Sequence, residues 1–157
     1  MRLPSAAQRV QDALAALGCG ARVREMPETT RTAGEAAAAC GCDQGAIVKS
    51  LIFRLAGAGG GLLVLTSGTN RVHEKRLGRQ LGDRLARADS DFVRATTSYA
   101  IGGVPPVGHA TPMRVIMDCD LFDHTAIWAA AGTPRAVFPS TPDELAALTG
   151  AEVLDVT

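Results

Sequence analysis

A lysine inside a predicted strand is the first residue that could do chemistry. The chain has 14 Arg but only two Lys, and Lys49 falls in the segment 46–54, whose composition predicts a strand. Because alternate strand residues share a face, Lys49 would lie among Ile47, Leu51 and Phe53. An ammonium there must reach a cavity, a partner or solvent. It would suit an anionic or ester group of a ligand; a lysine that simply reaches water from the strand end is an equal alternative.

A loop rich in glycine and proline is the second candidate. The segment IGGVPPVGH packs three Gly and two Pro into nine residues. Glycine lets the backbone approach a ligand closely, and proline stiffens the loop. Free N–H groups in such a turn can stabilise an oxyanion, which makes Gly102 and Gly103 candidates. His109 at its end could donate a hydrogen bond or act as a base; the plainer alternative is an exposed His on a rigid turn.

Two further turns follow apolar strands and could line the same cavity. The first is TSGTNR, residues 66–71, and the second contains Gly132 and Thr133. Ordinary connecting loops are the alternative for both. No G-x-S-x-G motif occurs, and no Ser/His/Asp or Cys/His set can be assigned. We therefore predict no covalent nucleophile.

The cysteines and histidines do not form a metal-binding pattern. Cys40 and Cys42 make C-x-C rather than C-x-x-C, and the three His are not paired at helical spacing. A zinc site needs a closer ligand set. We expect reduced thiols and neither a metal nor another cofactor.

Charge is balanced over the chain but not along it. The formal net charge is zero, yet residues 71–87 hold six cations against two acids. Such an excess could meet a phosphate backbone, with Lys75, Arg76 and Arg79 as the candidates. A solvated helix face is the alternative.

Short, mixed elements must position these residues. The Gly-rich run 57–61 reads as a hairpin connection. Ser5 and Ser90 are predicted caps, and Thr32 with Glu35 makes a capping box. Mixing without strict βαβ alternation predicts a mixed α/β fold, a sheet flanked by helices. Periodicity predicts helices over 5–17, 32–40, 73–81, 90–97 and 141–149, and strands over 21–26, 46–54, 62–66, 84–88, 113–117, 125–130, 135–139 and 153–156.

Length and hydropathy point to one soluble domain over residues 1–157. That length is enough to bury a core, and 46% of the residues are hydrophobic. No apolar run approaches the roughly 20 residues that span a bilayer. The first residues lack the apolar stretch of a signal peptide. We expect a cytoplasmic protein with no membrane partner; the oligomeric state stays open.

The ordered set of motifs resembles the YbaK/ProX aminoacyl-tRNA editing family. Over about residues 5–156 the order is IVKSL, a strand ending in TSGTNRV, a helix, GGVPPVGH, AIWAAAGTPRAVF and P-D-E-L-x-x-L-T-G-A. The same domain is similar to the editing insertion of bacterial-type prolyl-tRNA synthetases. The resemblance implies a mixed α/β fold with a curved, mostly antiparallel central sheet.

The resemblance also implies an activity, a deacylase that hydrolyses the ester of mischarged tRNA. Its expected substrate is a small amino acid such as Ala or Cys on proline tRNA, and a prolyl-tRNA synthetase is a further expected partner. Water would attack, assisted by the terminal hydroxyl of the tRNA or by the thiol of a cysteinyl substrate. The implied catalytic groups are Lys49, Gly102 and Gly103; the implied substrate-binding residues are Ser50, Thr66, Ser67, Asn70, Arg71, Pro105, Gly108, His109, Gly132 and Thr133.

Two other functions remain open at this point. One is a non-catalytic module that binds tRNA or a synthetase, and the other is a hydrolase of small molecules. Turnover with excess substrate would separate an enzyme from a binding module. Independence from the tRNA and from salt would mark the small-molecule hydrolase.

Overall fold

An eight-stranded mixed sheet organises the chain in the computed structural model, which describes residues 2–157. The strand order is β1-β7-β6-β2-β3-β5-β8, with β4 paired to β2 off this path. The strands are β1 (Arg24–Glu25), β2 (Ile47–Leu55), β3 (Gly61–Ser67), β4 (Leu85–Arg87), β5 (Arg114–Asp118), β6 (Ile127–Ala130), β7 (Ala136–Ser140) and β8 (Glu152–Leu154). The helices are α1 (Ser5–Ala16), α2 (Ala33–Cys40), α3 (Glu74–Leu81), α4 (Ser90–Thr97) and α5 (Pro142–Thr149), with short 3-10 turns η1 (Gln44–Ala46) and η2 (Cys119–Asp123).

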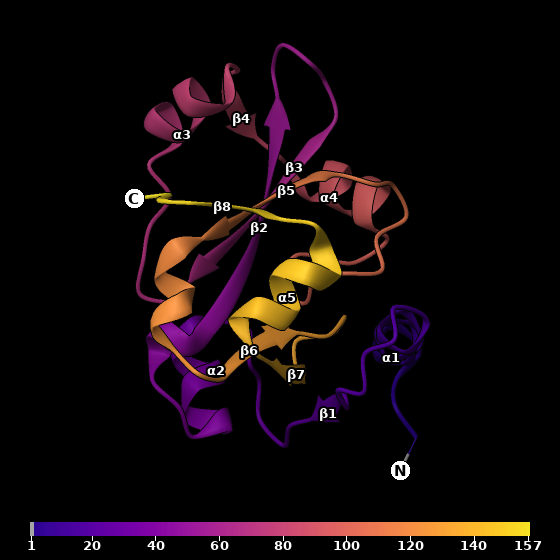
Figure 1. The fold of residues 1–157 in the computed structure, drawn as a ribbon. Coiled ribbons are helices and arrows are strands. Elements are labelled where there is room, and N and C mark those ends of the chain that lie inside the picture. Colours follow the sequence, from indigo (N-terminus) through magenta and orange to yellow (C-terminus); the bar gives the residue numbers. More distant parts are fainter. Residues whose placement is uncertain (1) are drawn as a thin grey trace.

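The β2–β3 hairpin is the axis of the molecule. Its strands pair antiparallel from Val48↔Ser67 to Arg54↔Gly61, and the Gly-rich run connects them as predicted. Figure 1 shows this connection projecting at one end, with α3 and β4 beside it. The pairs β2–β6, β3–β5 and β5–β8 are parallel and the other four are antiparallel. The predicted mixed, mostly antiparallel sheet is confirmed.

One edge of β2 is only partly covered. It pairs with β6 at Ile47 and Val48, and with β4 from Phe53 to Leu55. Within residues 2–157 no strand pairs with this edge between positions 49 and 52. A strand edge without a partner leaves backbone N–H and C=O groups free. A notch therefore opens in the sheet beside Lys49.

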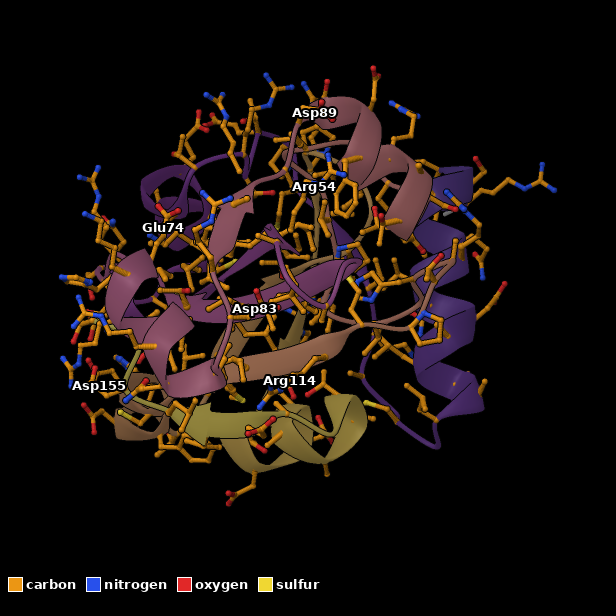
Figure 2. The ribbon with its side chains drawn as sticks, turned by 90° about the horizontal axis from the view of Figure 1, so that it is seen from above. Arg54, Glu74, Asp83, Asp89, Arg114 and Asp155 are labelled. Carbon is orange, nitrogen blue, oxygen red and sulfur yellow. The ribbon has the colours of Figure 1, made fainter. Side chains whose placement is uncertain are left out.

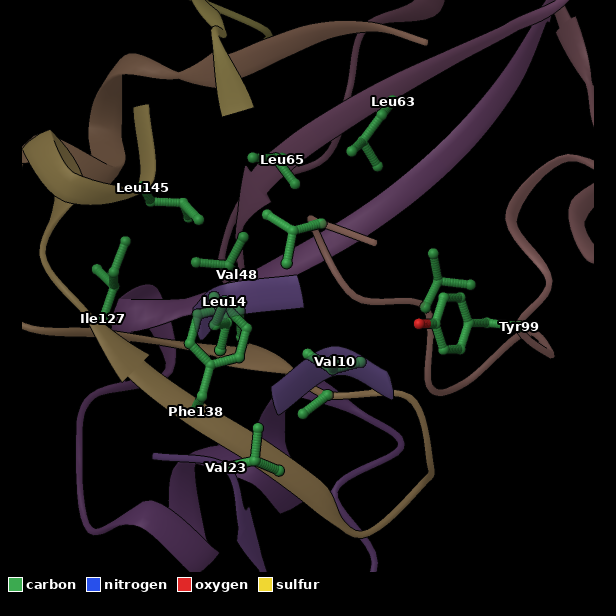
Figure 3. Close-up of a cluster of buried hydrophobic side chains, with 14 of the residues drawn as sticks. Val10, Leu14, Val23, Val48, Leu63, Leu65, Tyr99, Ile127, Phe138 and Leu145 are labelled. Carbon is green, nitrogen blue, oxygen red and sulfur yellow. The ribbon is translucent and has the colours of Figure 1, made fainter. Parts of the chain in front are cut away.

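The two faces of the sheet bury separate apolar clusters. Leu63 and Leu65 of β3 point into the larger cluster, together with Leu14 of α1 and Phe138 of β7 (Figure 3). The alternate residues of β3, with Leu77 of α3, belong to the smaller cluster. Alternation along β3 thus places one side chain on each face in turn. Fully burying a leucine contributes about 1.5–3 kcal/mol, so these clusters fix the hairpin that carries the notch.

The N-terminal cap predicted for α2 is confirmed, whereas the caps predicted for α1 and α4 are wrong. Thr32 and Glu35 form the predicted capping box of α2. Ser5 and Ser90 are not caps: Pro4 precedes α1 with no side-chain cap, and Asp89 caps α4 by accepting the Phe92 N–H at 2.8 Å. Figure 2 shows Asp89 at the start of α4, near Arg54, whose guanidinium lies 4.7 Å from the Phe92 ring centroid. Asp89 occupies the extended position just before the helix, which an N-cap residue requires.

None of the helices in residues 2–157 has the length and apolar character needed to cross a bilayer.

Candidate active site

A cavity of about 620 Å³ opens at the uncovered edge of β2. Its volume is in the usual range for small-molecule sites. Lys49 and Gly102, predicted from separate motifs, both line it. The wall consists of residues 30–34, Ala36, Gln44, 47–52, Gly68, Val93, Ile101, Gly102, Val104, 128–130 and Val137.

Lys49 is half-buried in this wall and is held by a backbone carbonyl. Its Nζ donates to the carbonyl oxygen of Asn70, in the turn after β3, at 2.6 Å. Burial lowers the pKa of the ammonium, and the nearby Arg71 guanidinium lowers it further. The Asp118 carboxylate opposes both effects on this pKa. The strand thus delivers a partly desolvated cation to the cavity.

A second cation, Arg31, lies in the same wall. It precedes α2, and its side chain packs on the glycine loop: a Cβ built on Gly102 would lie 3.3 Å from Arg31 Cγ and 3.4 Å from Nε. Among residues 2–157, no hydrogen bond or ion pair occupies the guanidinium. Sequence reasoning missed this residue because nothing separates it from the other 13 Arg. Its five N–H donors remain available to an anionic ligand.

The two glycines of the loop play different structural parts. Gly102 has a φ of 100°, lines the cavity, and donates no backbone hydrogen bond within the described chain. Gly103 is buried; its N–H donates to the Ala100 carbonyl at 3.2 Å. A Cβ on Gly103 would come within 2.9 Å of the Thr133 backbone, so only glycine fits there. The structure leaves the Gly102 N–H free and uses Gly103 for packing.

The later turn supports the glycine loop from behind. The Gly132 N–H donates to the Gly103 carbonyl at 2.8 Å, and Thr133 Oγ1 accepts the Arg135 N–H at 3.2 Å. Neither Gly132 nor Thr133 lines the cavity. The two turns are brought together, with the glycine loop nearer the ligand space.

Hydroxyl residues of the hairpin fall on both sides of the sheet. Ser50 lines the cavity, whereas Thr66 is fully buried opposite Lys49 and Ser67 is 2% exposed. Ser67 Oγ donates to the Gly45 carbonyl at 2.7 Å. Of the three, only Ser50 lines the cavity; its hydroxyl oxygen and that of Thr66 are buried and have no hydrogen-bond partner within the described residues.

His109, at the end of the glycine–proline loop, forms a hydrogen bond back to the same loop. His109 Nε2 lies 2.6 Å from the carbonyl oxygen of Pro105, which is buried. Burial lowers the pKa of His109, against the opposing effect of that hydrogen bond. A Cβ on Gly108 would meet Ala13 of α1 and Tyr99. Pro105, Gly108 and His109 lie outside the cavity wall and shape the loop that presents Gly102.

The basic helix α3 lies beside a second cavity. Lys75 and Arg79 line this hollow of about 590 Å³, between α3 and β4. Arg76 instead bonds the Thr157 carbonyl at 2.7 Å and pairs with Asp155 at 3.5 Å. The exposed Arg71 lies nearer Lys49, whose pKa it lowers. Lys75 and Arg79 thus share one hollow, whereas Arg76 is bound to the C-terminal segment.

Asp118 is a polar residue that sequence reasoning missed. It ends β5, is 0% exposed, and accepts the Ser67 N–H at 3.0 Å and the Asn70 Nδ2 at 2.9 Å. A carboxylate closing an apolar strand is the signal that could have revealed it. Its carboxylate, the Cys119 thiol and the Asp120 carboxylate lie within 4.8 Å of one another. Both Asp118 oxygens already accept protein N–H groups, so the geometry assigns no metal there.

Comparison with known proteins identifies the family of the chain. A family model for the aminoacyl-tRNA editing domain matches residues 27–148. Uncharacterized protein YwhH of Bacillus subtilis (strain 168) is 29% identical over 124 residues, 78% of each chain. A solved chain described as a "putative trans-editing enzyme for prolyl tRNA synthetase" is 49% identical, with a TM-score of 0.94 over 99% of both chains. Hypothetical protein APE2540 is 32% identical, with a TM-score of 0.86 over 94% of this chain and 98% of that one.

The match covers Lys49, the glycine loop and the later turn, and the neighbouring structures share the same sheet. The predicted resemblance is confirmed: the chain belongs to the aminoacyl-tRNA editing domain family.

Proposed function

We propose that this cavity hydrolyses the ester of a mischarged tRNA, with a small neutral amino acid on proline tRNA as the substrate. One observation carries the proposal: the same cavity is lined by Lys49 and by Gly102, whose N–H has no acceptor among the described residues. The neighbour described as serving prolyl tRNA synthetase supports the choice of tRNA and makes that synthetase a partner to test.

The charges of the cavity wall suit the 3′ end of a tRNA. Lys49 and Arg31 are cations, and no Asp or Glu is among the described lining residues. Cations without acidic competitors attract phosphate and a polarised ester carbonyl. The free edge of β2 adds backbone donors and acceptors for the sugar and base. The remaining wall is mostly apolar, with Ile47, Val48 and Trp128, and accommodates the amino-acid side chain.

The proposed chemistry is direct attack by water on the ester. A new bond forms between the water oxygen and the carbonyl carbon, and the bond to the ribose oxygen breaks. The products are a free amino acid and a tRNA with its terminal hydroxyl restored. No described lining residue is an Asp, Glu, His or Cys, so the proton of the attacking water passes, through the neighbouring ribose hydroxyl or through solvent, to the departing ribose oxygen. Lys49 and the Gly102 N–H stabilise the oxyanion, and one such donor is typically worth about 10²–10³ in rate.

We expect the cavity to select its substrate by the size of the amino-acid side chain. One methylene in an apolar pocket supplies only about 1–3 kcal/mol of discrimination, which is why a second sieve is useful in translation. A cavity that admits small side chains and excludes larger ones removes the errors that a synthetase cannot reject. A panel of purified mischarged tRNAs identifies the amino acid and the tRNA.

The decisive variant is Lys49→Ala. We expect it to lower deacylation of the preferred mischarged tRNA by at least about 10²-fold, because an oxyanion-stabilising donor is lost. The measurement is release of labelled amino acid under multiple turnover. Arg54→Ala is the matched control, since Arg54 is on the same strand but exposed and outside the cavity wall.

Wild-type turnover by a folded Lys49→Ala protein would contradict the proposed mechanism. Stoichiometric protection of the ester without turnover would instead identify a binding module. Equal hydrolysis of amino-acid esters with and without tRNA would identify a small-molecule hydrolase.

A further inference from the structure

A buried carboxylate stands behind the catalytic lysine. Asp118 has no exposed surface, and its Oδ2 accepts both the Ser67 N–H and the Asn70 side-chain amide. Its Oδ1 accepts the Asp120 N–H at 3.0 Å. A buried charge is tolerated only where it is paired or fully hydrogen-bonded, so this arrangement costs free energy that some benefit must offset.

The hydrogen bonds of Asp118 lead to Lys49 through a single residue. Asn70 Nδ2 bonds Asp118 at 2.9 Å and Asp120 at 2.7 Å. The backbone carbonyl of the same Asn70 accepts Lys49 Nζ at 2.6 Å. Asn70 therefore connects the two groups: its side chain binds the Asp118 carboxylate, and its backbone carbonyl binds the Lys49 ammonium.

We propose that Asp118 is a positioning residue, which fixes the turn 67–70 so that the Asn70 carbonyl holds the Lys49 ammonium toward the cavity. The inference rests on the proposed function, because it assigns Lys49 the reacting role. Asp118 does not line the cavity, so a substrate bound there would not contact it. Its effect is on where the amine lies and on whether the amine keeps its proton.

The second effect follows from the charges around Lys49. Burial and Arg71 lower the pKa of Lys49, and Asp118 raises it. Asp120, on η2, also accepts the Asn70 side-chain amide at 2.7 Å, but the charges that shift this pKa are those of Arg71 and Asp118. If Asp118 is replaced by a neutral residue, the Lys49 ammonium loses a nearby negative charge. Its pKa then falls, and it gives up its proton at lower pH.

The test is Asp118→Asn, measured as kcat, KM and the pH dependence of kcat. The new amide NH₂ faces a protein N–H donor, so the turn shifts, and a displacement of about 1 Å can cost on the order of 10²-fold in rate. We expect kcat to fall by about 10- to 100-fold with KM within about twofold. We also expect the alkaline limb of the pH profile to move to lower pH, because activity is lost as pH rises through a reduced Lys49 pKa.

Two further variants separate position from charge. Asn70→Ala keeps the carbonyl that binds Lys49 but releases the turn from Asp118, so kcat should fall while the alkaline limb stays in place. Asp120→Asn removes the same formal charge from an exposed residue and retains an oxygen for Asn70, so it should behave as wild type.

A folded Asp118→Asn protein with near wild-type kcat would overturn the inference, as would a loss of kcat with an unmoved alkaline limb. Circular dichroism and thermal melting show whether Asp118→Asn folds. If it does not, Asn70→Ala tests the inference, and an unchanged kcat in that variant would overturn it. These failures are distinct from failure of the proposed function, which shows as activity of Lys49→Ala.

Discussion

At the cavity wall, Lys49 and Arg31 are cations in different surroundings. Lys49 is half-buried and bound to a carbonyl, whereas Arg31 is exposed and rests on Gly102. Desolvation strengthens the interaction of Lys49 with a developing negative charge. An exposed guanidinium is better suited to a phosphate, which it can bind through two N–H groups. We therefore expect substitutions of the two residues to affect different kinetic constants.

Replacing Arg31 by alanine should raise KM for the mischarged tRNA about 5- to 10-fold and leave kcat within about twofold, since one phosphate contact is typically worth about 1–2 kcal/mol. The slope of log KM against log salt should fall by about one. Steady-state kinetics at several salt concentrations measure both.

Arg22→Ala is the control for that experiment, because Arg22 is exposed and outside the cavity wall. An Arg31→Ala protein with an unchanged salt slope would mean that the tRNA phosphates bind elsewhere, and the hollow beside α3 would be the next place to probe.

At this scale the sequence predicts some residues and misses others for identifiable reasons. Lys49 is predictable because lysine is rare here and its strand is otherwise apolar. Arg31 and Asp118 escape notice because their partners, Gly102 and Asn70, are far away in the chain. The Gly102 loop is predictable from composition, but its division into a free N–H and a packed neighbour depends on the turn at Thr133.

Among the elements, hydrophobic periodicity locates most helices and strands within a few residues, because their core faces have regular spacing. The cap of a helix is harder to predict from sequence when two residues that can act as caps are adjacent. The segment ADS before α4 offers both Asp89 and Ser90, and the helix begins at Ser90 with Asp89 as its cap. Local sequence favours either position, and packing of α4 selects one.

The pair Asp89→Ala and Ser90→Ala tests that assignment. Asp89→Ala should cost about 1 kcal/mol in the free energy of unfolding, because the Phe92 N–H loses its acceptor. Ser90→Ala should change it by less than about 0.5 kcal/mol. Urea denaturation of both proteins gives the comparison, and equal losses would contradict the cap.

For the molecule as a whole, local patterns predict the class of the fold but not the strand order. The sheet joins β2 to β6 and β3 to β5 in parallel, so neighbours in the sheet are far apart in the chain. Periodicity carries no information on such pairings, and the family resemblance supplied the expected sheet instead. The notch beside Lys49 depends on these pairings, since it is the gap between β6 and β4 along β2.

Helix α1 offers a test of how far this long-range packing extends. Leu14 is fully buried in the larger cluster, and Leu17, one turn later, is 51% exposed. Leu14→Ala should lower the free energy of unfolding by about 2–5 kcal/mol through the cavity it leaves. Leu17→Ala should change it by less than about 0.5 kcal/mol. Thermal and urea unfolding measure both, and equal effects would show that α1 is not part of the cooperative unit.

The contact between α1 and the later turn has a practical consequence. A Cβ on Gly132 would lie 2.7 Å from the Ala6 carbonyl, so the first helix presses on the backbone that supports the glycine loop. The recognisable family segment begins at residue 27 and ends at residue 148. A gene fragment trimmed to those limits would keep Lys49, the glycine loop and the later turn, yet expose the underside of the glycine loop. Anyone transplanting this domain into another protein should carry the leading helix with it.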